Sequence, residues 1–132
     1  MMKEEFEALA GYEVTWEDYC NIIEPMYMAT KLNKAEFVKC IDKKRFALRP
    51  LKSIVKEMKK LAAQLEETCT HFSDYETKEK IEDLAREYVK RKYGMGFSFG
   101  VHEEMKWSCY YPKSIEIWGV KDYITIESIV LV

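Results

Sequence analysis

PLKSIVKEMKKLAAQLEETCTH, residues 50–71, predicts one amphipathic helix around which the rest of the chain is organised. Its apolar residues recur three and four positions apart, so they share one helix face. These residues are Leu51, Ile54, Val55, Met58, Leu61, Ala62 and Leu65. Lysines occupy the opposite side of the same turns. Pro50 suits the first turn of a helix, because its missing N–H would have no helical partner there.

Local signals predict shorter helices before residue 50. A short helix is expected at 3–9, and Thr15 caps the next one. Pro25 kinks that helix or divides it in two, because proline removes a hydrogen bond and clashes with the preceding turn. Asn33 caps a helix over 34–44, with Glu36 three residues later as in a capping box. Its expected buried residues are Phe37, Val38, Cys40 and Ile41.

A second long helix is predicted after the first. Ser73 or Asp74 caps it, three basic residues at 90–92 favour its C-terminal end, and Gly94 stops it. Its expected apolar face is formed by Ile81, Leu84, Ala85, Tyr88 and Val89. Because only a short turn separates the two long helices, we expect them to lie antiparallel as the spine of the fold.

After Gly94 the apolar period changes from 3.6 to 2, which indicates strands. Turns are expected at 111–114 and 119–122. The predicted fold class is therefore α+β: an N-terminal helical bundle of about four to five helices, followed by a small C-terminal antiparallel β-meander of three or four strands packed on it. The length of 132 residues predicts one domain, 1–132, with a helical part at 1–93 and a β part at 94–132.

Composition is that of a globular protein, with 48% hydrophobic and 33% charged residues. No apolar run approaches the roughly 20 residues that cross a bilayer, so no membrane contact is expected. Residues 1–6 lack the apolar stretch of an export signal, which predicts a cytoplasmic protein. The cysteines are scattered and never paired as Cys-x-x-Cys, so reduced core thiols are expected. They are Cys20, Cys40, Cys69 and Cys109.

No combination of residue types predicts catalysis. Cys69 lies near His71, and Cys109 could approach His102, but nothing in either spacing specifies a poised thiolate and its base. No paired spacing suggests a zinc site. Three glycines at 94, 96 and 100 follow a helix and precede a strand, the reverse of a phosphate loop. We therefore predict no catalytic residue, no metal and no cofactor, and no enzyme.

Charge is unevenly distributed along the chain. Residues 1–24 have a net charge of −6, whereas residues 31–60 have a net charge of +8. The candidate binding surface consists of Lys43, Lys44, Arg45, Arg49, Lys52, Lys56, Lys59 and Lys60. Basic residues gathered on one surface are typical of binding to a phosphate backbone. If residues 1–24 fold over this block, the opposite charges only stabilise the fold; if they lie elsewhere, the lysines form a binding surface.

The sequence resembles a family of small uncharacterised proteins encoded on phages and mobile elements of anaerobic Gram-positive bacteria. The similar segments are LAGYEV at 9–14, IEPMYMAT at 23–30 and KKRFAL at 43–48, and the resemblance covers about residues 1–93. It carries over no functional residue. It implies a small accessory protein that binds host or phage macromolecules.

Together these patterns predict a non-enzymatic accessory protein that acts by binding another, unidentified protein. The alternative is a nucleic-acid-binding accessory protein that uses the basic 43–60 region. Ile129-Val130-Leu131-Val132 forms an apolar terminal strand, which must be paired or covered. Homo-oligomerisation through this C-terminal strand is therefore a third expectation.

Overall fold

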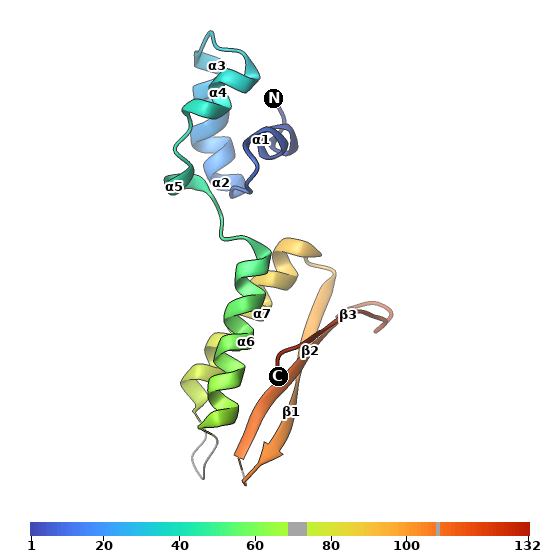
Figure 1. The fold of residues 1–132 in the computed structure, drawn as a ribbon. Coiled ribbons are helices and arrows are strands. Elements are labelled where there is room, and N and C mark those ends of the chain that lie inside the picture. Colours follow the sequence, from blue (N-terminus) through green and yellow to red (C-terminus); the bar gives the residue numbers. More distant parts are fainter. Residues whose placement is uncertain (69–73, 108) are drawn as a thin grey trace. The chain divides into compact units, whose positions relative to one another are not determined.

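The computed structural model describes residues 1–68, 74–107 and 109–132. Helices are followed by a three-stranded antiparallel sheet at the C-terminal end, which confirms the predicted α+β class (Figure 1). The chain forms two compact units, Met1–Pro50 and Leu51–Val132, each with its own hydrophobic core. The border lies inside the predicted helical part, because the two long helices share a unit with the sheet. That 1–132 acts as one domain stays a prediction.

The first unit is built from short helices around aromatic and branched side chains. The helices are α1 (Lys3–Ala10), α2 (Trp16–Asp18), the π-helical turn η1 (Tyr19–Ile23), α3 (Glu24–Ala29), α4 (Lys34–Cys40) and α5 (Lys43–Phe46). Their shared core consists of Phe6, Val14, Tyr19, Ile23, Phe37, Val38, Ile41 and Phe46. The oxygen of Thr15 accepts from the backbone N–H of Asp18 at 3.0 Å, which confirms the predicted cap.

Pro25 lies at a change of helix type, where the π-helical turn η1 gives way to a new α-helical segment, α3. It lies in the first turn of α3, directly after the five residues of η1. In η1 the backbone N–H of Glu24 bonds to the carbonyl of Tyr19, five residues back. This wider turn gives room for the pyrrolidine ring, which would clash with a regular α-helical turn. The helical path therefore continues through the proline.

The predicted helix over 34–44 is wrong in its continuity, because the helix is interrupted at residues 41–42. Helix α4 ends at Cys40, and Ile41 adopts an extended conformation. Asp42 then caps a separate short helix, since its carboxylate accepts from the N–H of Lys44 at 3.0 Å. Phe37, Val38 and Ile41 are buried as expected, but Cys40 is exposed. The break turns Ile41 into the core and leaves Cys40 outside it.

Replacing Asn33 with alanine tests the other predicted cap in this unit. The Asn33 side chain accepts from the N–H of Glu36 at 2.9 Å, so its loss should destabilise Met1–Pro50 by about 0.5–2 kcal/mol. Asn33→Asp keeps an accepting oxygen and should cost much less. Thermal unfolding of the full-length variants, followed by circular dichroism, measures the difference. Equal stabilities of the alanine and aspartate variants would contradict the capping role.

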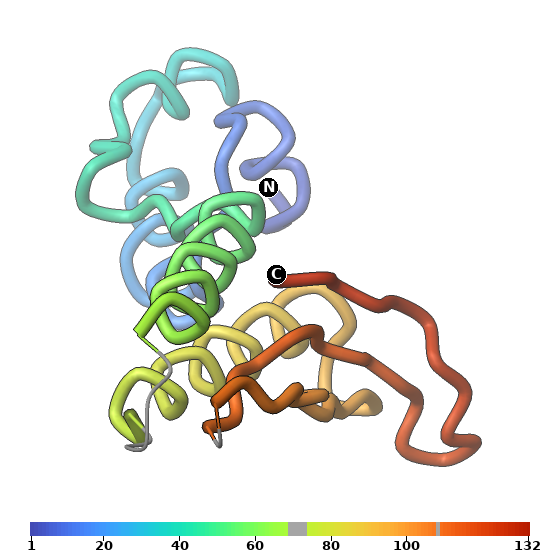
Figure 2. The backbone as a smooth tube through the Cα atoms, turned by 60° about the horizontal axis from the view of Figure 1, so that its bottom comes forward, coloured from blue at the N-terminus to red at the C-terminus, as the bar shows by residue number. Residues whose placement is uncertain are grey.

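In the second unit, two long helices pack on one face of the sheet (Figures 1 and 2). They are α6 (Leu51–Glu67) and α7 (Tyr75–Lys92), and they contact each other along their length. Asp74 caps α7 by accepting from the N–H of Thr77, whereas Ser73 lies outside the described residues. Gly94 ends α7 with a left-handed φ of 89°, which glycine adopts without steric cost.

The sheet has the order β1-β2-β3, with β1 at Phe97–Lys106, β2 at Cys109–Gly119 and β3 at Thr125–Val130. The turn predicted at 111–114 is wrong, because these residues continue β2. Pro112 is tolerated there for two reasons. The pairing register with β1 shifts at this point, and β3 pairs with β2 only from Ser114 onward. The turn predicted at 119–122 is confirmed.

The helix-facing side of the sheet completes the second core. Ile115 and Ile117 of β2 share this core with the buried residues of α6 and α7. The side chains of β3 alternate between the two faces: Ile124 and Ile126 are exposed, while Ile129 is buried. Glu127 pairs with the buried Ile117, and Ile129 pairs with the buried Ile115, so these β3 residues share the helix-facing side. The apolar repeat at 124–126 therefore faces solvent.

The prediction of core thiols holds for one described cysteine. Cys109 is buried, but Cys20 and Cys40 are exposed. Cys20 lies in the π-helical turn, whose core contacts come from Tyr19 and Ile23 instead. Cys69 lies outside the described residues.

Candidate functional site

The eight predicted basic residues fall into two groups that belong to different units. Lys43, Lys44 and Arg45 are exposed on α5, and Arg49 is exposed shortly after it. The other group lies on α6 and is called the lysine face: Lys52, Lys56, Lys59 and Lys60. Within its unit the structure therefore brings together four of the eight residues.

All four side chains of the lysine face are exposed. Their spacing of four, three and one residues places them on one stripe, opposite the buried Ile54 and Met58. Among the described residues of Leu51–Val132, no carboxylate forms an ion pair with any of the four. The stripe thus carries four positive charges without an ion pair to the described carboxylates of its unit.

Two acidic side chains of residues 1–24 have partners inside their own unit. The Glu5 carboxylate lies 2.6 Å from the Lys34 ammonium, and Glu7 lies 3.1 Å from Lys3. The hydrogen bond from Lys34 lowers the pKa of Glu5. Glu7 also accepts from the backbone N–H of Val14 at 2.9 Å. These two carboxylates are therefore engaged with basic residues other than the eight candidates.

A shallow hollow of ≈ 300 Å³ lies at one end of the lysine face. Its lining residues are Leu51, Lys52, Val55, Tyr88 and Lys92, from the first turns of α6 and the last turns of α7. Two of them are cationic and two are aliphatic. The hollow is thus bounded by Lys52 on one helix and by Lys92 on the other.

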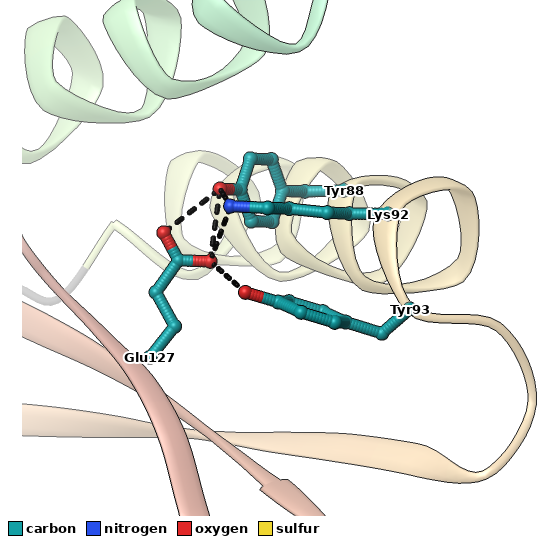
Figure 3. Close-up of polar contacts among 4 residues, drawn as sticks. All are labelled: Tyr88, Lys92, Tyr93 and Glu127. Atoms are coloured by element: carbon teal, nitrogen blue, oxygen red, sulfur yellow. Dashed lines mark hydrogen bonds and ion pairs between the residues drawn. The ribbon is translucent and has the colours of Figure 1, made fainter.

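Lys92 belongs to a polar cluster that joins α7 to β3 (Figure 3). Glu127 of β3 accepts from the hydroxyl of Tyr88 at 2.9 and 3.0 Å, from the hydroxyl of Tyr93 at 2.6 Å and from the Lys92 ammonium at 3.0 Å. Lys92 also donates to the Tyr88 hydroxyl at 3.0 Å. Its ammonium lies 5.3 and 5.2 Å from the centroids of the two tyrosine rings. Three residues of one helix end thereby hold one strand residue.

The cluster favours defined protonation states. Burial alone would raise the pKa of Glu127, but the hydrogen bonds from Tyr93, Lys92 and Tyr88 outweigh it and lower that pKa. The hydrogen bonds to Tyr88 and Glu127 raise the pKa of Lys92. Burial raises the pKa of Tyr88 and of Tyr93. At neutral pH the group is an ionised carboxylate, an ammonium and two neutral phenols, which suits a structural connection better than proton transfer.

The other face of the sheet is not covered by α6 or α7, and one edge of the sheet is formed by β3. Ile126 and Val130 are 44% and 61% exposed on this strand. A second hollow, of ≈ 460 Å³, lies at the β2–β3 turn. Its lining includes Met95, Phe97, Val120, Ile124 and Ile126. Apolar side chains therefore gather beside an open strand edge.

His102 pairs with a carboxylate on β2 and does not act as a base beside Cys109. Its Nε2 is 2.6 Å from the Glu116 carboxylate, and Glu116 also accepts a hydrogen bond from Thr125. These two bonds, that of Thr125 first, lower the pKa of Glu116. His102 opposes Ser114, whereas Cys109 opposes Lys106, four residues farther along β1. The structure does not bring Cys109 and His102 together, and the pair Cys69 and His71 lies outside the described residues.

The three glycines have the structural roles that the sequence predicts. Gly94 ends α7 and Gly96 precedes β1. Gly100 lies under the indole of Trp118, where an added Cβ would approach a ring carbon to 2.8 Å. The described ranges 1–68, 74–107 and 109–132 contain no group of three or more His, Cys, Asp or Glu side chains placed to hold a metal ion. Within those ranges, no helix has the length and apolar character to cross a membrane.

Sequence reasoning missed the Glu127 cluster and the hollow beside Lys52. Glu127 is separated from Tyr88 by 39 residues, and no local pattern links them. The one sequence signal for this cluster is an acidic residue, Glu127, within the otherwise uncharged strand β3. We compared the chain with models of protein families, with curated proteins and with solved structures, and none of these comparisons found a significant match.

Proposed function

We propose that this chain is a non-enzymatic accessory protein of a phage or mobile element that binds another protein through the open edge of β3. The observation that supports this most is the combination of unpaired backbone groups and exposed apolar side chains on one strand. The occupant that fits is an extended segment of a partner protein, which adds to the sheet as a further strand.

Hydrogen bonding defines which groups of β3 are available. The N–H of Leu131 donates to the carbonyl of Lys113 at 2.8 Å, so it points toward β2. Because antiparallel pairing alternates along a strand, the N–H of Ile129 points the same way, and those of Ser128 and Val130 point outward. These outward groups can donate to an added strand.

Side chains around this edge also favour an apolar partner. Ile126 and Val130 offer contact area beside the outward N–H groups. The single charged residue of β3 is Glu127, and it is turned toward α7 and balanced by Lys92. By contrast, the edge formed by β1 carries Glu103, Glu104 and Lys106. Charged residues on an edge discourage strand addition, so β3 is the better docking edge.

Ser128→Pro should weaken binding at this edge without unfolding the protein. Proline removes the outward N–H of Ser128, and on an edge strand it breaks no bond within the sheet. Immobilised wild type and variant are exposed to an extract of an anaerobic Gram-positive host, and a retained protein is purified and titrated. We expect at least a tenfold weaker affinity for Ser128→Pro. Binding of the purified partner should also protect the amides of Ser128 and Val130 from hydrogen exchange.

Ser128→Ala is the matched control, because it removes the same hydroxyl and keeps the N–H. It should bind the partner as the wild type does. Equal affinity of the proline variant and the wild type would overturn the proposed site. Sedimentation velocity tests a second copy of the chain as occupant. A concentration-dependent dimer that Ser128→Pro abolishes would support self-association, whereas a monomer at all concentrations would contradict it.

A further inference from the structure

The lysine face has the charge and shape of a surface for a polyanion. Lys52 and Lys60 are eight residues apart, so the stripe is about 12 Å long along α6. Four like charges over this length repel one another, and no described carboxylate of their unit forms an ion pair with them. A polyanion bound along the stripe would relieve the repulsion among the four lysines. This surface is separate from the β3 edge.

We propose that the lysine face binds the phosphate backbone of duplex DNA without reading base sequence. Duplex DNA presents one negative charge about every 1.7 Å of its axis, so several phosphates lie within reach of the stripe. Contacts between lysines and phosphates supply affinity and carry no sequence information. The inference goes beyond the proposed protein binding and does not depend on it.

The composition of α6 favours a duplex over a single strand. Single-strand binding proteins stack bases on aromatic side chains along a basic groove. Helix α6 contains no aromatic residue, and the neighbouring Tyr88 is buried. A membrane surface fits less well, because the apolar face of α6 is already buried in the core and is not free to enter lipid.

The number of free lysine charges determines how strongly the DNA affinity should depend on salt. Lys92 lies across the hollow from Lys52, but Glu127 balances its charge, so it adds no free cation. Four phosphate contacts predict a slope of about −3.6 for log K against log salt, since each contact contributes about −0.9. Affinity should therefore fall roughly 150-fold between 50 and 200 mM salt.

Fluorescence anisotropy of a labelled 20-base-pair duplex, titrated with the full chain at several salt concentrations, tests the proposal. Lys59→Gln with Lys60→Gln should halve the salt slope, to about −1.8. Lys80→Gln with Lys121→Gln removes the same charge from exposed positions on α7 and the β2–β3 turn. This control pair should leave the slope unchanged.

Three results would overturn the proposal: no duplex binding at 50 mM salt, equal losses in the two double variants, or tighter binding of the single strand. Binding to phosphatidylserine vesicles in place of the duplex would also overturn it. Ser128→Pro should bind the duplex as the wild type does. The lysine variants therefore test DNA binding alone, and Ser128→Pro tests protein binding at the β3 edge alone.

Discussion

Replacing Ile117 with alanine is expected to lower the free energy of unfolding of Leu51–Val132 by about 2–5 kcal/mol. Ile117 is 0% exposed and lies in the central strand, within the core that α6 and α7 form with the sheet. Its side chain loses three carbon atoms in the variant, and the packed helices limit how far the cavity can collapse. Chemical denaturation followed by circular dichroism measures the loss.

Ile126→Ala provides a matched control on the same sheet. Ile126 is 44% exposed, so the same chemical change should cost less than 1 kcal/mol, because much of its side chain already contacts water. If both substitutions destabilised the protein equally, the assignment of the two sheet faces would be wrong. The comparison therefore tests whether Ile117 lies on the helix-facing side of the sheet and Ile126 on the exposed side.

The long helices could be predicted because their signals are local and repeated. The apolar stripe of α6 contains the buried Ile54, Met58, Ala62 and Leu65, all expected from spacing alone. The stop of α7 at Gly94 likewise follows from one residue type. Periodicity over many turns averages out single exceptions, which explains why these elements are confirmed.

The structure differs from the predictions where a single residue changes the local path of the chain. Asp42 caps α5, but its position inside an apolar period predicts that it continues the helix over 34–44. Pro112 usually marks a turn, yet a register shift and a missing neighbour allow it within β2. In β3 it is Ile129 that enters the core, so the apolar pair Ile124 and Ile126 lies on the exposed side. Each outcome depends on contacts with distant strands or helices that sequence spacing does not contain.

The candidate surfaces show the same division. Lys52, Lys56, Lys59 and Lys60 could be grouped from the sequence, because helix geometry alone places them on one stripe. That Lys43, Lys44, Arg45 and Arg49 belong to another compact unit could not be predicted. Nor could the Glu127 cluster, which joins a strand to a helix end more than 30 residues earlier. This cluster also fixes β3, and so it supports the edge proposed for partner binding.

Glu127→Gln should destabilise Leu51–Val132 by about 1.5–3 kcal/mol at pH 7, the range for hydrogen bonds to a charged group. The lower half of that range is expected, because the Lys92 side chain is 38% exposed and water screens its charge. The glutamine oxygen can still accept from Tyr88 and Tyr93, but Lys92 loses its counter-charge. Urea denaturation at pH 7, 5, 4 and 3 measures both the size and the pH dependence.

The pH dependence has a defined sign. The pKa of Glu127 is lowered in the folded protein, so its ionised form is favoured by folding. The resulting stability is fully present above the ordinary glutamate pKa of 4.5 and is lost as pH falls through the folded value. The wild type and Glu127→Gln should therefore converge in stability toward pH 3. Glu79→Gln, at an exposed site on α7, should differ little from the wild type at pH 7. A gap between wild type and Glu127→Gln that stays constant from pH 7 to pH 3 would show that the carboxylate charge does not hold β3 to α7.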